Sequence, residues 1–70
     1  MYFTDMKPTF HYLTEHERDV PWCKVVELIQ KTKNPRKRGK TFEIKTEGYY
    51  IVFIIRNQIL YVINAKKVIK

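Results

Sequence analysis

The chain has 70 residues with 14 basic and 7 acidic side chains, which give a formal net charge of +7. This length predicts one domain, residues 1–70, with a thin core, and is too short for two. The single cysteine, Cys23, excludes an internal disulfide and favours a reducing, cytoplasmic setting, and the longest apolar run, residues 49–55, is far short of the roughly 20 residues that a membrane helix needs.

Two helical segments are predicted in the first half of the chain. The sequence of residues 14–17 fits a capping box with Thr14 as N-cap and predicts a helical turn over residues 15–19. The main helix is predicted over residues 21–33, because Pro21 suits the first position of a helix. Four apolar residues of this segment recur at helical spacing and form one stripe: Trp22, Val25, Val26 and Ile29.

The segment of residues 31–40 carries six positive charges and no acid, and we predict a basic loop there. Three strands are predicted after it, over residues 41–46, 49–56 and 59–64. Close turns at Glu47-Gly48 and Asn57-Gln58 join these strands and indicate an antiparallel meander.

The middle predicted strand is apolar on both faces, which is typical of a central strand that is covered on two sides. We therefore expect an α+β fold with one main amphipathic helix packed on a three- or four-strand antiparallel sheet. The helix covers one face, and either the N-terminal segment or a second molecule must cover the other. We favour the N-terminal segment because of its apolar side chains: Tyr2, Phe3, Phe10, Tyr12 and Leu13.

Charge is distributed unevenly along the chain. Residues 1–30 carry three basic and five acidic side chains, and residues 31–70 carry eleven basic and two acidic ones. Such a concentration of cations suits contacts to phosphate, onto which arginine can fork. Nucleic acid is therefore the predicted partner. The predicted contact residues are Lys31, Lys33, Arg36, Lys37, Arg38, Lys40, Lys45 and Arg56. The alternative is a solvated loop, or one that meets an acidic protein.

Tyrosines among these cations favour RNA over DNA. Tyr49, Tyr50 and Tyr61 lie on the predicted strands, and exposed tyrosines can stack with unpaired bases. The alternative is that they are ordinary strand residues, since tyrosine is common in sheets.

Catalytic candidates are few. His16 lies among acidic residues that favour its charged form, so it could act as a general acid, with Arg56 stabilising the phosphate. The alternative is an ordinary exposed histidine. No metal site is predicted, because His11, His16 and Cys23 lack a recognised ligand spacing. The two glycines form no nucleotide-binding loop, so no cofactor is expected.

Three stretches carry a resemblance to a known family: Leu13-Thr14-Glu15-His16, Val25-Val26-Glu27-Leu28-Ile29 and Leu60-Tyr61-Val62-Ile63-Asn64-Ala65. Together with the order of the elements, they resemble the small RelE-like and BrnT-like toxin-type domains of toxin–antitoxin pairs. The resemblance implies a compact α+β domain that cleaves RNA through basic residues and is held inactive by an antitoxin. By residue type and rough position it nominates His16, Arg18, Arg36, Arg38 and Arg56.

Three hypotheses about function follow. The first is an RNA-directed module of the toxin type, at most a metal-independent ribonuclease, paired with an antitoxin-like protein or with a second copy of itself. The second is a DNA-binding protein without catalysis. The third is a protein-interaction module whose basic loop meets an acidic partner. A preference for single strands supports the first and a preference for duplexes the second, whereas the third predicts that neither nucleic acid binds.

Overall fold

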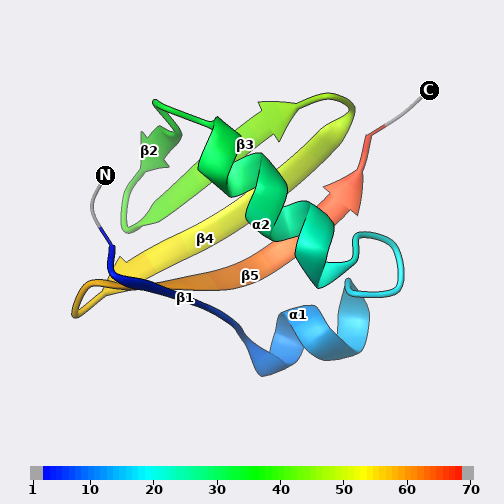
Figure 1. Cartoon of the computed structure of the whole chain (residues 1–70), viewed down its shortest axis with the longest axis horizontal. Coiled ribbons are helices and arrows are strands. Elements are labelled where there is room, and N and C mark those ends of the chain that lie inside the picture. Colours follow the sequence, from blue (N-terminus) through cyan, green and yellow to red (C-terminus); the bar gives the residue numbers. More distant parts are fainter. Residues whose placement is uncertain (1–2, 69–70) are drawn as a thin grey trace.

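The computed structural model describes residues 3–68 and has an α+β arrangement of five strands and two helices (Figure 1). The elements in chain order are β1 (Asp5–Pro8), α1 (Phe10–Glu15), α2 (Trp22–Lys31), β2 (Arg36–Arg38), β3 (Thr41–Thr46), β4 (Tyr49–Arg56) and β5 (Ile59–Lys67). Across the sheet the strands lie in the order β1-β5-β4-β3-β2. No helix within the described residues is long and apolar enough to cross a membrane.

The sheet contains the predicted meander and two further strands. Strands β3, β4 and β5 pair antiparallel in sequence, as expected. However, β2 pairs antiparallel with β3 at one edge, and β1 pairs parallel with β5 at the other. The prediction of a three- or four-strand, wholly antiparallel sheet was therefore wrong. Strand β2 arises inside the predicted basic loop, because an edge strand tolerates a run of exposed charged residues.

The two hairpin turns within the meander share one backbone geometry. Their central residues have positive φ angles, 52° and 81° at Glu47 and Gly48, and 52° and 65° at Asn57 and Gln58. Two-residue turns of this kind match the right-handed twist of the flanking strands. They fix the start of each pairing, with Thr46 opposite Tyr49 and Arg56 opposite Ile59.

Helix α1 lies earlier in the chain than the predicted helical turn. Thr9 is its N-cap, and the Thr9 hydroxyl accepts a hydrogen bond from the backbone N–H of Tyr12. The same hydroxyl donates to the carbonyl of Val62 on β5, which anchors the start of α1 to the sheet. The predicted N-cap, Thr14, lies inside the helix, where its hydroxyl donates back to the carbonyl of Phe10. The expectation of a single main helix was wrong, because α1 is a second helix.

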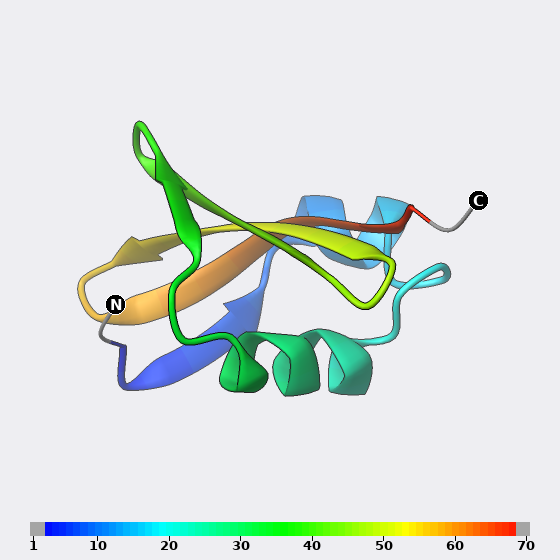
Figure 2. The ribbon, with the colours of Figure 1, turned by 90° about the horizontal axis from the view of Figure 1, so that it is seen from above.

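Helix α2 is the predicted amphipathic helix, and it packs on one face of the sheet (Figure 2). It begins after Pro21, which is the N-cap residue, and it ends at Lys31, two residues earlier than predicted. Three of its side chains are fully or almost fully buried against the sheet: Val25, Leu28 and Ile29. Trp22 is half-buried and packs against the edge of the core.

A β-bulge in β5 keeps its apolar residues in the core. The register between β4 and β5 shifts by one position between Val52 and Phe53, so that Ile63 is an extra residue on β5. Val62 and Ala65 are three positions apart, and both are fully buried because of this extra residue. Without the bulge, the alternation of a strand would turn one of them to the other face.

The N-terminal segment extends the sheet and does not cover its second face. Strand β1 lies at the sheet edge, and α1 follows beside β5 (Figure 1). The Tyr12 ring enters the core next to Trp22, with ring centroids 5.7 Å apart, whereas Phe10 is 80 % exposed. The prediction that this segment covers the second face was therefore wrong for the described residues. Tyr2, which was part of that prediction, lies outside them.

Candidate nucleic-acid interface

The face of the sheet that is turned away from α2 is called the open face here. On β4 it carries every second residue from Tyr50, because the intervening residues Ile51 and Phe53 are fully buried beneath α2. The central side chains of the open face are half-buried and come from β4 and β5: Tyr50, Val52, Ile54, Ile59 and Tyr61. Polar and basic residues surround this apolar strip.

Tyr50 lies between two of the basic residues of the open face. Its direct cross-strand neighbours are Lys45 on β3 and Lys66 on β5. The two ammonium groups lie 5.6 Å and 5.4 Å from the centroid of the Tyr50 ring, within the range of cation–π attraction. An aromatic ring between two cations therefore faces outward on the side of the sheet that α2 leaves free.

Glu43 connects Tyr50 to the arginines of β2. The Tyr50 hydroxyl donates a hydrogen bond to the Glu43 carboxylate, and Arg38 Nη1 lies 3.7 Å from the second carboxylate oxygen. Arg36 is the cross-strand neighbour of Glu43. The hydrogen bond from Tyr50 is the main cause that lowers the pKa of Glu43, and nearby arginines lower it further. The same bond raises the pKa of Tyr50, so the pair is a carboxylate beside a neutral phenol at neutral pH.

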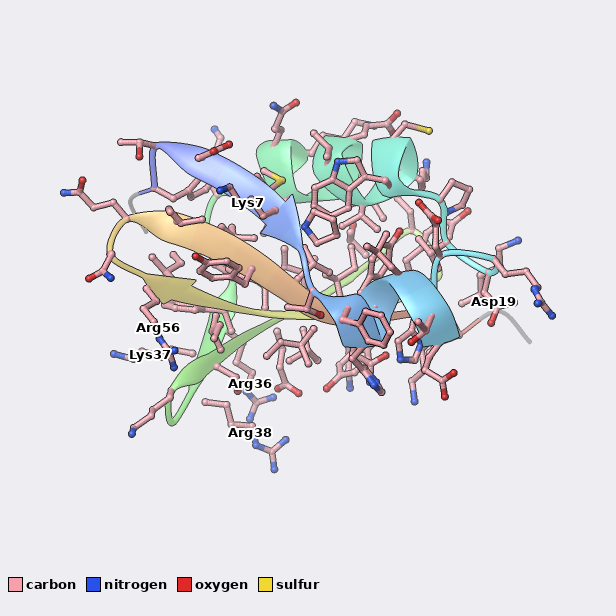
Figure 3. All side chains as sticks on the ribbon, turned by 90° about the horizontal axis from the view of Figure 1, so that it is seen from below. Lys7, Asp19, Arg36, Lys37, Arg38 and Arg56 are labelled. Carbon is pink, nitrogen blue, oxygen red and sulfur yellow. The ribbon has the colours of Figure 1, made fainter. Side chains whose placement is uncertain are left out.

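The predicted basic contact residues do not all lie on the open face. Alternation along the strands places Arg36, Arg38, Lys45 and Arg56 there. Figure 3 shows the labelled arginines together with Lys37 at one end of the molecule. The other four predicted residues lie elsewhere: Lys37 on the opposite face of β2, Lys40 in the β2–β3 turn, Lys33 in the segment after α2, and Lys31 at the end of α2.

Lys31 forms ion pairs with two acidic residues on the side of α2. Its ammonium group lies 3.3 Å from the Glu27 carboxylate and 3.7 Å from that of Glu47. Lys24 pairs with the same Glu27 carboxylate at 3.1 Å. The exposed side of α2 is therefore a mixed-charge surface and not a basic one.

The three predicted stacking tyrosines are split between the two faces. Tyr50 and Tyr61 lie on the open face, whereas Tyr49 packs against the core and has Lys24 at 5.3 Å from its ring centroid. Alternation along β4 separates Tyr49 from Tyr50, because adjacent strand residues point to opposite faces. A stacking surface can therefore include two of these tyrosines and not three.

The predicted catalytic pair, His16 and Arg56, is not brought together. Arg56 lies at the β4–β5 turn, where it pairs with Ile59, whereas His16 caps the far end of α1. These two places are at opposite ends of the molecule (Figure 1). His16 instead contacts His11, with 3.1 Å between their Nε2 atoms. Glu43 was not among the predicted site residues, because its contacts with Tyr50 and Arg38 depend on strand register.

Within residues 3–68, no group of three or more His, Cys, Asp or Glu side chains is arranged to hold a metal ion. What the open face offers is an aromatic ring, a carboxylate and several cations within a few ångströms of one another. A scan against protein-family models found no match, and searches of curated proteins and of solved structures likewise found none.

Proposed function

We propose that this protein binds single-stranded RNA across the open face of its sheet. The observation that supports this most directly is the position of Tyr50, half-buried between Lys45 and Lys66. A base can stack on such a ring while the lysines reach the adjacent phosphates, which is how sheet surfaces take up unpaired bases. Tyr61 supplies a second ring on the same face.

A single strand fits this surface better than a duplex does. Bases within a duplex are stacked on each other, so the tyrosines would have no base to contact. Reading a DNA groove would call for a basic helix or ribbon that projects from the protein. The exposed side of α2 pairs Lys24 and Lys31 with Glu27 and offers no such helix, whereas the β2–β3 hairpin is a two-stranded ribbon with exposed basic residues. DNA binding without catalysis remains the alternative that the experiment below compares.

The test is the affinity for a fluorescently labelled single-stranded RNA and for a duplex DNA of the same sequence over a salt series. Six basic side chains rim the open face: Lys7, Arg36, Arg38, Lys45, Arg56 and Lys66. If all six contact phosphate, log affinity for the RNA should fall with log salt at a slope of about −4. Tighter binding to the duplex would support the DNA-binding alternative, and no binding to either would support a module for an acidic protein.

A charge-matched pair of variants locates the surface. Lys45→Ala with Lys66→Ala and Lys24→Ala with Lys31→Ala each remove two positive charges, from the open face and from α2 respectively. We expect the first double variant to make the salt slope shallower by about one unit and the second to leave it unchanged. Equal effects would mean that the interaction follows net charge alone.

A metal-independent ribonuclease is a second candidate function, which the contact of Glu43 with Tyr50 and Arg38 favours. In this proposal the Glu43 carboxylate takes the proton of a ribose 2′-hydroxyl, and the 2′-oxygen attacks the adjacent phosphorus. The 5′-oxygen leaves and takes a proton from water, and the product strand ends in a 2′,3′-cyclic phosphate. Arg36 and Arg38 would stabilise the extra negative charge at phosphorus.

Binding and cleavage can be separated by one substitution. Glu43→Gln should keep RNA affinity and abolish cleavage, because the amide cannot accept the 2′-hydroxyl proton. A strand of the same sequence that lacks 2′-hydroxyl groups should bind and stay intact. Cleavage that persists in Glu43→Gln would remove this residue from the mechanism. An antitoxin-like partner, or a second copy of this chain, that binds the open face should compete with RNA for it.

A further inference from the structure

Strands β3 and β4 separate before β4 ends. Their pairing stops at Phe42 and Phe53, although β4 continues to Arg56. The tip of the β2–β3 hairpin bends away from α2, so that it leaves the plane of β4 (Figure 2). A cavity of about 470 Å³ lies between the hairpin and the last residues of β4. This cavity is called the notch below.

Three cations line the notch. Lys37 and Lys40 come from the hairpin, and Arg56 comes from the end of β4. All three are exposed, and within residues 3–68 no ion pair engages any of them. The residues that line the notch include no acid. Figure 3 shows Lys37 and Arg56 at the same corner of the molecule. Uncompensated positive charge from three side chains favours a ligand with two negative charges over one with a single charge.

The rest of the notch is apolar. Its lining includes the half-buried side chains of Phe42, Ile54 and Ile55. Phe42 is held in place by stacking on Phe53, with ring centroids 5.3 Å apart and the planes inclined by 11°. An apolar wall beside three cations suits a ligand that joins a flat ring to a phosphate.

The backbone supports the same ligand. In an antiparallel ladder the N–H and C=O groups of successive residues point alternately to the two neighbouring strands. Those of Ile55 point toward β3, and the β3–β4 register stops before it reaches them. At the hairpin tip, Gly39 has a φ of 64° and open space where a side chain would begin, so a ligand can approach its backbone closely.

We propose that the notch binds a nucleotide that carries a terminal phosphate monoester. Lys37, Lys40 and Arg56 hold the phosphate, which carries close to two negative charges at neutral pH, and the base lies against Phe42 and Ile54. The notch proposal rests on the proposed function. Arg56 belongs both to the notch and to the open face, so an RNA strand that crosses the open face would place its end in the notch. The ligand class is then the phosphorylated end of an RNA strand.

The experiment titrates ¹⁵N-labelled protein with 5′-AMP, adenosine and inorganic phosphate, each alone, and follows the backbone amides. We expect 5′-AMP to shift the amides of Gly39, Lys40 and Ile55, and to bind about tenfold more tightly than adenosine or phosphate. Binding of 5′-AMP no tighter than adenosine, or shifts confined to the open face, would overturn the proposal.

Two variants test the residues of the notch. Lys37→Ala and Lys40→Ala should each weaken 5′-AMP about fivefold to tenfold, since each removes a charged contact to phosphate. Both side chains are exposed, so the fold should be kept. Lys24→Ala removes the same charge from α2 and should leave 5′-AMP affinity unchanged. Equal weakening in all three variants would mean that only net charge matters and would overturn the site.

Oligonucleotides separate the notch from the proposed function. A 5′-phosphorylated RNA should bind more tightly than the same RNA with a 5′-hydroxyl, and Lys37→Ala should remove the difference. If RNA binds and the phosphate makes no difference at either end of the strand, the notch proposal fails and RNA binding stands. If 5′-AMP binds and no RNA does, the open-face proposal fails and the notch stands as a site for free nucleotides.

Discussion

Tyr50 on β4 donates its hydroxyl hydrogen to the carboxylate of Glu43 on β3, diagonally across the open face. Diagonal neighbours in a sheet lie within reach of an aromatic side chain, and here the contact joins a phenol to a partly shielded carboxylate, 12 % exposed. The contact orients the ring that we propose as a stacking surface and holds the carboxylate that we propose as a base. The two proposals therefore share one structural feature.

The Tyr50–Glu43 contact should make part of the stability depend on pH. The folded-state pKa of Glu43 is lowered from its ordinary value of 4.5, so the carboxylate stabilises the fold above that value. This contribution should be lost as the pH falls through the lowered pKa. We expect Glu43→Gln to be less stable than the parent near pH 6, with the difference shrinking toward pH 3, as measured by urea unfolding at a series of pH values. A difference that grows on acidification would contradict the assignment.

The hydroxyl of Tyr12 should contribute to stability through one buried hydrogen bond. It donates to the carbonyl of Val20, and burial raises the pKa of Tyr12 to about 12, so that the group stays protonated. Tyr12→Phe leaves that carbonyl buried without its partner and should cost about 1–3 kcal/mol of unfolding free energy. Tyr61→Phe removes a hydroxyl from the open face and is the control, with an expected change below about 0.5 kcal/mol. Similar losses in both variants would argue against the buried bond.

The packing of α2 on the sheet can be tested at two positions of the same helix. Leu28 is fully buried, so Leu28→Ala should cost about 2–5 kcal/mol, a large share of the stability of a domain this small. Val26 is half-buried, and Val26→Ala should cost clearly less. Chemical unfolding measures both. A larger loss at Val26 would mean that the helix is rotated about its axis.

The turn after β4 can be improved. Gln58 has a φ of 65°, a left-handed conformation that costs a residue with a Cβ about 1 kcal/mol and costs glycine nothing. Gln58→Gly should therefore raise the unfolding free energy by up to about 1 kcal/mol. Gln30→Gly makes the same exchange inside α2 and should lower it by about the same amount. A lower unfolding free energy in both variants would contradict the left-handed conformation of Gln58.

Local sequence signals predicted the meander and α2 because short turns and apolar periodicity specify them directly. The remaining strands depend on tertiary pairing. Strand β1 is four residues long and pairs with a strand more than fifty positions away, and β2 consists of three exposed basic residues. Strand β2 contains no apolar residue, and β1 alternates polar and apolar residues over only four positions, which is too short a run to mark it as a strand.

The site was only partly predictable for a related reason. Counting from the Glu47-Gly48 turn places Lys45 opposite Tyr50, as found. Counting from the next turn places Ala65 opposite Tyr50, whereas the bulge at Ile63 brings Lys66 there. A bulge has no sequence signal of its own here, so the second cation beside the ring could not be foreseen. The placement of Tyr49 and Tyr50 on opposite faces could have been predicted, because strand alternation alone requires it.

The central claim is that single-stranded RNA stacks on the open face, and exchanging one tyrosine on each face tests it most directly. Tyr61→Leu removes a ring from the open face and Tyr49→Leu removes one from the side of α2, and both keep an apolar side chain. In a binding titration with a labelled single-stranded RNA, on variants shown to be folded by circular dichroism, Tyr61→Leu should weaken binding about tenfold and Tyr49→Leu should leave it unchanged. Unchanged affinity in Tyr61→Leu, or equal losses in the two variants, would contradict the account.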